Sequence, residues 1–127
     1  MPWLSFFAVG SGAALGAWMR WGLGLWLNPV FPTVPLGTVT ANLFGGFLMG
    51  IVMSAADPLG LAPATRLLLA TGFLGGLTTF STFSAETTTL LLRHQYAWAC
   101  LAVAVHVGGS LLLTAMGLFL ARGLLGR

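Results

Sequence analysis

The chain has 127 residues, of which 57% are hydrophobic and 18 more are glycine, whereas only five basic and two acidic residues carry a charge. Charged residues make up 6% of the sequence, against about 25% in an ordinary soluble domain. So few charges cannot cover the surface of a water-soluble protein. The composition therefore excludes a cytosolic enzyme, a nucleic-acid-binding module and a disordered segment. It indicates a small integral membrane protein.

The charged residues and the single cysteine narrow the possible sites further. The excess of positive charge comes from five scattered arginines against Asp57 and Glu86, with no basic cluster that would bind phosphates. Cys100 is the sole cysteine, which excludes an intrachain disulfide and a cysteine-rich metal site. Nucleic acid is accordingly not an expected partner, whereas membrane lipid is.

Four segments are long and apolar enough to cross a bilayer, whose hydrocarbon core of about 30 Å requires about 20 residues of helix. We predict spans near residues 3–27, 35–56, 66–92 and 96–121. Turn-forming sequences separate them: Asn28-Pro29 with Pro32 and Pro35, Asp57-Pro58-Leu59-Gly60 with Pro63, and Arg93-His94-Gln95. The expected fold is an all-α membrane protein in which residues 1–127 form a single four-helix transmembrane domain.

The arginines give little preference for one orientation in the membrane. With four spans, Arg66, Arg122 and Arg127 lie on one side, and Arg93 lies on the other, with Arg20 near it. Such a weak bias fits a protein that a partner orients. It also fits dual topology, in which the same chain inserts both ways and pairs antiparallel with itself, and we favour this second interpretation.

Polar residues recur on one face of the second and fourth spans. Thr38 and Asn42 are four residues apart, and His106, Ser110 and Thr114 follow one another at the same spacing. Hydrogen bonding between helices explains any one of these residues, at roughly 0.6–2 kcal/mol per contact. Two such stripes in one small protein favour a polar pathway. Three GxxxG motifs indicate close helix packing: Gly12–Gly16, Gly46–Gly50 and Gly72–Gly76.

The third span contains a sequence that forms helix poorly. Gly75-Gly76 and Thr78-Thr79 lie near its middle, and glycine and β-branched threonine disfavour helix. A break there would free carbonyl groups that lipid cannot satisfy, so that protein, water or an ion must do so. Carbonyls turned inward would bind a hard cation. The alternative is an ordinary helix whose hydroxyls bond to their own preceding turn.

Phe80 and Phe83 lie three residues apart, among Ser81, Thr82 and Ser84. Aromatic residues in a membrane helix usually contact lipid or pack against other helices. The edge of an aromatic ring is nevertheless electropositive. Two such edges in a narrow pore would hold a small anion without the full charge that would trap it.

Arg20 and Glu86 are the two charged residues in the interior of the predicted spans, whereas Arg66 is the boundary residue of the third span. At about 1.5 Å per residue, both lie about 10 Å from the same membrane surface. They are expected either to form an ion pair or to act separately, with Arg20 attracting anions at a pore mouth.

The segment GGLTTFSTFSAE, residues 75–86, resembles the GGxTTFSTFSxE signature of the Fluc (CrcB-type) fluoride channels. Residues 35–38 with 41–45 resemble the second-helix motif of that family, and residues 16–20 resemble its GxxxR motif. Gly109-Ser110 and Thr114 are similar to its fourth helix. The resemblance covers all four predicted helices, and the third-helix signature is highly specific.

The resemblance implies a dual-topology antiparallel homodimer with two passive, fluoride-selective pores, located in a bacterial inner membrane. Such a channel exports cytoplasmic fluoride and protects the cell from its toxicity. The implied fluoride pathway comprises Phe80, Phe83, Asn42, Ser110, Thr114, His106, Ser81 and Thr82. Arg20 is implied at a vestibule. The main-chain carbonyls of Gly75 and Thr78 are implied ligands of a structural sodium ion, the sole cofactor expected.

His106 departs from the polar or aromatic residue that relatives often carry at this position. Imidazole can be neutral or charged near physiological pH, so His106 is expected either to make conduction depend on pH or to serve as a neutral hydrogen-bonding group. We favour the neutral group.

Two other functions compete with a channel, and no catalytic constellation points to an enzyme. A small proton-coupled cation or drug exporter would also be short and could also insert both ways. It requires a membrane-embedded carboxylate, whereas the first span has none and Glu86 lies toward a membrane edge. A structural subunit would explain the glycines but not the polar stripes.

Overall fold

The computed structural model describes residues 2–126, and these form helices joined by short loops, with no strand among them. The first two long segments are α1 (Pro2–Leu27) and α2 (Leu36–Ala55), with the short helix η1 (Asn28–Val30) between them. The third segment comprises α3 (Pro63–Arg66), η2 (Leu67–Leu74), α4 (Gly75–Leu77) and α5 (Phe80–Leu92). The fourth comprises α6 (Tyr96–Val103), η3 (Ala104–Gly109) and α7 (Ser110–Leu124).

Three helical stretches of the described chain are long and apolar enough to cross a membrane, judged by length and composition: Leu36–Ala55, Pro63–Leu92 and Tyr96–Leu124. Helix α1 has 26 residues but is not among them. The protein is therefore a multi-pass membrane protein of helices.

The observed boundaries differ from the predicted ones chiefly in the third and fourth segments. Pro63, which we placed in the second loop, is instead the first residue of α3. Proline suits this position because its fixed φ matches the helix and its missing N–H would have had no helical partner. The fourth segment continues to Leu124, three residues beyond the predicted end. Arg127, which we counted toward the charge bias, lies outside the described residues.

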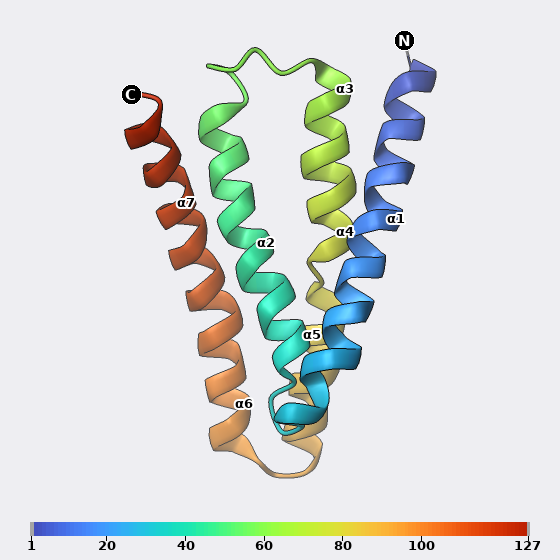
Figure 1. The fold of residues 1–127 in the computed structure, drawn as a ribbon. Coiled ribbons are helices and arrows are strands. Elements are labelled where there is room, and N and C mark those ends of the chain that lie inside the picture. Colours follow the sequence, from blue (N-terminus) through green and yellow to red (C-terminus); the bar gives the residue numbers. More distant parts are fainter. Residues whose placement is uncertain (1, 127) are drawn as a thin grey trace.

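The third segment is broken where the glycine and threonine sequence predicted it. Thr78 and Thr79 have extended backbone angles, with φ, ψ of −86°, 153° and −148°, 120°. Two stretches elsewhere, η2 and η3, form wider π-helix, a geometry often found at functional sites. The break separates an upper half, η2–α4, from the lower half, α5 (Figure 1).

The helices pack in two close pairs, α1 along η2 and α2 along α7 (Figure 1). A Cβ atom added at Gly16 would collide with the Phe73 carbonyl and would lie 2.6 Å from the Leu77 nitrogen. One added at Gly50 would collide with the Thr114 carbonyl. The helices therefore touch backbone to backbone, as the GxxxG motifs predicted.

Both ends of the described chain lie at the same end of the molecule as the α2–α3 loop (Figure 1). The buried core is small, and its centre consists of Ala41, Leu74 and Leu77, each at most 2% exposed. Large apolar side chains elsewhere face outward, among them Phe6, Trp26 and Leu124. An apolar exterior of this kind suits lipid contact rather than water.

The glycine contacts predict that Gly16→Ala destabilises the protein, because the added methyl group meets the backbone of η2 and α4. Overpacking of this kind costs about 1–3 kcal/mol. Gly10→Ala on the same helix is the matched control, since no described atom beyond its chain neighbours and the adjacent backbone of its own helix lies within 4 Å of its added Cβ. Thermal unfolding of the purified variants in detergent would measure the stability of each. Equal midpoints for the two variants would contradict the packing described here.

Candidate functional site

The chain break at Thr78–Thr79 is stabilised by hydrogen bonds on both sides. The N–H and hydroxyl of Thr78 donate to the Leu74 carbonyl at 3.0 and 2.8 Å, which closes the first half-helix. The Thr79 hydroxyl oxygen accepts from the Thr82 N–H at 3.1 Å and so caps the start of α5. A capping hydroxyl satisfies one of the donors that a helix start leaves without a partner.

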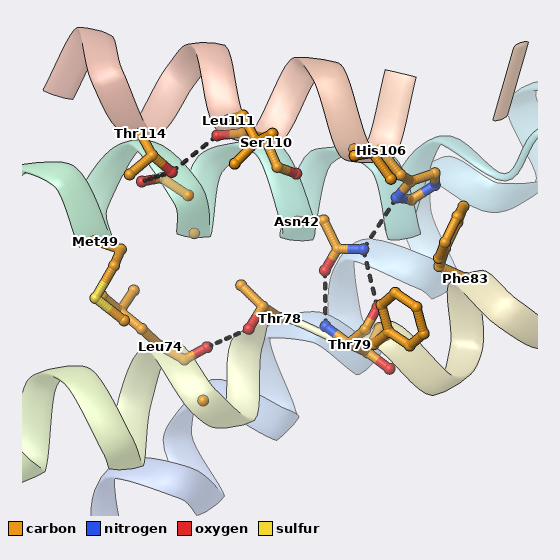
Figure 2. Close-up of a pocket in the computed structure, with 15 residues that line it drawn as sticks. Asn42, Met49, Leu74, Thr78, Thr79, Phe83, His106, Ser110, Leu111 and Thr114 are labelled. Atoms are coloured by element: carbon orange, nitrogen blue, oxygen red, sulfur yellow. Dashed lines mark hydrogen bonds between the residues drawn. The ribbon is translucent and has the colours of Figure 1, made fainter. Parts of the chain in front are cut away.

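The side chain of Asn42, on α2, replaces the hydrogen bonds that the backbone of Thr79 would make in a continuous helix. The Thr79 N–H donates to Asn42 Oδ1 at 2.7 Å, and Asn42 Nδ2 donates to the Thr79 carbonyl at 3.0 Å. The same amide nitrogen lies 3.0 Å from Nδ1 of His106 (Figure 2). One side chain thus links α2, the break and η3.

The ring of His106 packs against the aromatic residues of α5. Its centroid lies 4.7 Å from that of Phe83, with the planes tilted by 39°. The rings of Phe83 and Phe80 meet edge to face, with centroids 5.5 Å apart. Phe83 is buried, whereas 76% of Phe80 is exposed on the single chain. The two phenylalanines are therefore neighbours, but only Phe83 is enclosed within this chain.

The break changes which donors reach the carbonyls of the third segment. In a continuous helix the Gly75 carbonyl would accept from the Thr79 N–H, and the Thr78 carbonyl from the Thr82 N–H. These two N–H groups donate instead to Asn42 and to the Thr79 hydroxyl. The Gly76 carbonyl accepts from Arg20 Nε at 3.1 Å. Gly75 and Thr78 thus lose their helical donors, and free carbonyl oxygens of this kind are ligands that a hard cation accepts.

A cavity of about 410 Å³ lies beside the break. Figure 2 shows side chains from α2, the third segment and the fourth segment around it. Eight of the residues expected at a site line the cavity: Asn42, Gly75, Thr78, Phe80, Phe83, His106, Ser110 and Thr114. The structure thus gathers residues from three helical segments around one space.

The remaining three expected residues lie elsewhere. Arg20 and Thr82 line a second cavity of about 290 Å³, together with Thr38 and Asn28. Ser81 lines neither of these two cavities, and its hydroxyl lies 3.2 Å from that of Thr79.

The hydroxyls that line the main cavity differ in their partners. Thr114 Oγ1 donates to the carbonyls of Gly46, at 2.9 Å, and Ser110, at 2.8 Å. Its single proton is shared between one acceptor on α2 and one in its own helix, so it serves helix structure and packing, the role that we weighed against a pathway. Within residues 2–126, the Ser110 hydroxyl makes no recorded hydrogen bond. It is consequently the hydroxyl of this stripe with a proton to offer to a bound ion.

Of the two alternatives for Arg20 and Glu86, the ion pair does not form within the described residues. Arg20 donates to the Gly76 carbonyl, and Glu86 Oε2 accepts from the Thr38 hydroxyl at 2.7 Å. Arg66–Asp57, at 2.7 Å, is the one ion pair found within the described part of the chain. The depths of Arg20 and Glu86 along their helices indicated that the two residues are close, but each side chain bonds to a different partner on a neighbouring helix.

Sequence reasoning also missed the part that Thr79 and Thr38 play. Thr79 was recognised as the midpoint of the third span and as part of its helix-disfavouring sequence, but not as the residue whose backbone binds Asn42 and whose hydroxyl caps α5. The stripe of Thr38 and Asn42 on α2 was the available signal, since both residues reach across to α5 or to the break.

Thr79→Ala removes the cap of α5 and is expected to lower stability by about 1 kcal/mol, the usual cost of losing a threonine cap. Thr79→Ser keeps a hydroxyl that can accept from the Thr82 N–H, and it is expected to remain close to the original protein. Thermal unfolding in detergent separates the two variants. A serine variant as unstable as the alanine variant would show that the methyl group, and not the cap, is what matters.

Comparison with known proteins identifies the family of the chain. Residues 7–118 match the family described as CrcB-like protein, Camphor Resistance (CrcB). A protein of Nitrosospira multiformis named fluoride-specific ion channel FluC is 56% identical over 118 residues, which cover 92% of each chain. Proteins of the same name are 55% identical in Pseudomonas paraeruginosa, covering 98% of this chain and 99% of the relative, and 57% identical in Aromatoleum aromaticum, covering 89% and 87%. The chain belongs to the CrcB-like family.

Proposed function

We propose that this protein is a passive, fluoride-selective channel that exports cytoplasmic fluoride. The observation that carries the proposal is the cavity beside the helix break, which brings Phe80 and Phe83 together with His106 and Ser110. The relatives named fluoride-specific ion channel support it, because they match this chain over about nine-tenths of its length at more than half identity.

The chemistry of the cavity suits a small anion. Ring edges of Phe80 and Phe83 offer weak positive potential without a formal charge. Side chains that can donate hydrogen bonds, Ser110 and His106, line the same space. Ser81 and Thr82 would extend this polar path at the start of α5. Conduction requires an ion to bind well enough to enter and weakly enough to leave, and a site with no fixed positive charge meets both conditions.

Export needs no energy source beyond the membrane potential. Fluoride enters as its neutral weak acid and is trapped as the anion at cytoplasmic pH. A potential that is negative inside drives each anion outward by about 2.3 kcal/mol per 100 mV. A passive pore in a bacterial inner membrane would therefore protect the cell from fluoride, with Arg20 attracting the anion at a vestibule beside Thr82.

The complete channel is proposed to be an antiparallel homodimer of four-span chains, in which α1 is the remaining span. Helix α1 packs along η2 through Gly12 and Gly16, as a neighbouring span would. Phe80 lines the cavity yet is 76% exposed on the single chain, so that a second copy would complete the wall that one chain leaves open. The weak arginine bias supports insertion in both orientations.

A structural sodium ion is proposed where the broken third segment of one copy crosses the same segment of the second copy. Its ligands would be the main-chain carbonyls of Gly75 and Thr78, which lose their helical donors at the break. Both residues line the main cavity. Sodium, a hard cation, would supply the charge that balances these oxygens.

Purified protein in liposomes is expected to release fluoride rapidly and chloride slowly, as measured with two ion-selective electrodes in parallel. Phe80→Leu or Phe83→Leu should lower the fluoride flux about tenfold, the effect of losing about 1.4 kcal/mol of ion stabilisation. Phe6→Leu is the matched control, since Phe6 is exposed on α1 and lies outside the main cavity. Dimers that are well folded but release no fluoride would overturn the proposal. Cation export coupled to protons, dependent on Glu86, would then be tested.

Dual topology can be measured separately with a single cysteine in the α2–α3 loop. Leu59 is exposed in that loop, so Leu59→Cys combined with Cys100→Ser supplies one reactive site. A membrane-impermeant maleimide applied to intact cells or spheroplasts should label about half of the chains, because half of the loops face outward. A permeant maleimide is the control and should label all of them. Labelling of all chains or of none by the impermeant reagent would contradict dual topology.

A further inference from the structure

Both the oxygen and the nitrogen of the Asn42 side-chain amide make hydrogen-bonding contacts within the chain. Its oxygen accepts from the Thr79 N–H at 2.7 Å, and its nitrogen contacts both the Thr79 carbonyl and His106 Nδ1, each at 3.0 Å. An amide nitrogen carries two hydrogens. One hydrogen is available for each of these two contacts, so neither remains for an ion in the cavity.

The backbone of Thr79 determines which end of the amide faces which group. A backbone N–H can only donate and a carbonyl can only accept, so Asn42 Oδ1 must face the former and Nδ2 the latter. Rotating the amide by 180° would place the Nδ2 donor against the Thr79 N–H donor, and the Oδ1 acceptor against the Thr79 carbonyl acceptor. The donor that faces His106 is therefore fixed by the helix break and not by the imidazole.

We propose that Asn42 is a positioning residue that holds His106 as the neutral tautomer with its proton on Nε2. Nδ1 faces an N–H donor and must present its lone pair. The proton of the neutral ring then lies on Nε2, and the bond to Asn42 is the only one that the ring makes within residues 2–126. Packing against Phe83 at 4.7 Å holds the ring in this position.

The fixed tautomer assigns different tasks to Asn42 and His106. If the proposed function is correct, the Nε2–H of His106 is the donor available to an anion, and Asn42 acts through it. A proton added to Nδ1 would place two donors face to face and would break the link between η3 and the break. The inference rests on the proposed function only for the identity of the anion, since the hydrogen bonds belong to the ion-free chain.

The tautomer can be measured by solid-state NMR of the full-length protein in lipid bilayers, labelled with ¹⁵N-histidine and prepared without fluoride. The chain has two histidines, and the variant His94→Gln identifies which signals belong to His106. The original protein is expected to give an unprotonated Nδ1 and a protonated Nε2. A protonated Nδ1 in this sample would overturn the proposal without any variant at position 42.

Asn42→Asp is the decisive variant. An ionised aspartate still accepts from the Thr79 N–H but offers no hydrogen to His106 or to the Thr79 carbonyl. In spectra recorded at a pH at which this carboxylate is ionised, Nδ1 should therefore become protonated. Ser54→Ala is the matched control: it removes another hydrogen bond from α2 to the fourth segment, the 2.7 Å bond to the Leu118 carbonyl, and should leave the His106 signals unchanged. An unchanged tautomer in the aspartate variant would overturn the positioning role. Because no fluoride is present, a channel that failed to conduct fluoride would leave these outcomes readable.

Discussion

The structure depends on how a broken helix satisfies its backbone inside an apolar slab. Within a bilayer an unpaired N–H or carbonyl costs several kcal/mol, since there is no water to replace the lost partner. Here each side of the break has its own solution: Asn42 bonds to both backbone groups of Thr79, and Arg20 bonds to the Gly76 carbonyl. Polar residues on α1 and α2 are thus explained first by the break and only then by transport.

Close packing of the helices makes these contacts possible. Because α1 and α2 meet their neighbours at glycines, backbone approaches backbone, and a short side chain such as that of Asn42 can span the gap. Larger residues at Gly16 or Gly50 would push the helices apart and move the donors out of range. Packing and polar chemistry are therefore not separate features of this fold, since the first sets the distances that the second requires.

The sequence predicted the break well because local chemistry produces it. Paired glycines followed by two threonines disfavour helix wherever they occur, and Thr78–Thr79 is where the chain leaves it. The helical segments followed from the length of the apolar runs and the turn sequences between them, and the polar faces of α2 and the fourth segment followed from the spacing of their polar residues. The prediction that Pro63 lies in the second loop was wrong, because proline can begin a helix as readily as it can end one.

Partners across the fold could not be predicted in this way. Spacing along one helix gives depth but not rotation relative to a neighbour, so Arg20 and Glu86 were placed at one level and their actual partners, Gly76 and Thr38, were not anticipated. The tautomer of His106 depends on a donor fixed by a third residue. Such an arrangement becomes visible only when α2, the break and η3 are seen together.

The three-way contact of Asn42, Thr79 and His106 also limits how this sequence can change over evolution. Any residue that replaces His106 must offer an acceptor to the Asn42 amide, or position 42 must change with it. Thr79 contributes through its backbone, so its side chain can vary without affecting that pair. Positions 42 and 106, 64 residues apart in the chain, are therefore expected to be inherited as a unit. Substitutions at the two positions would have effects that do not add.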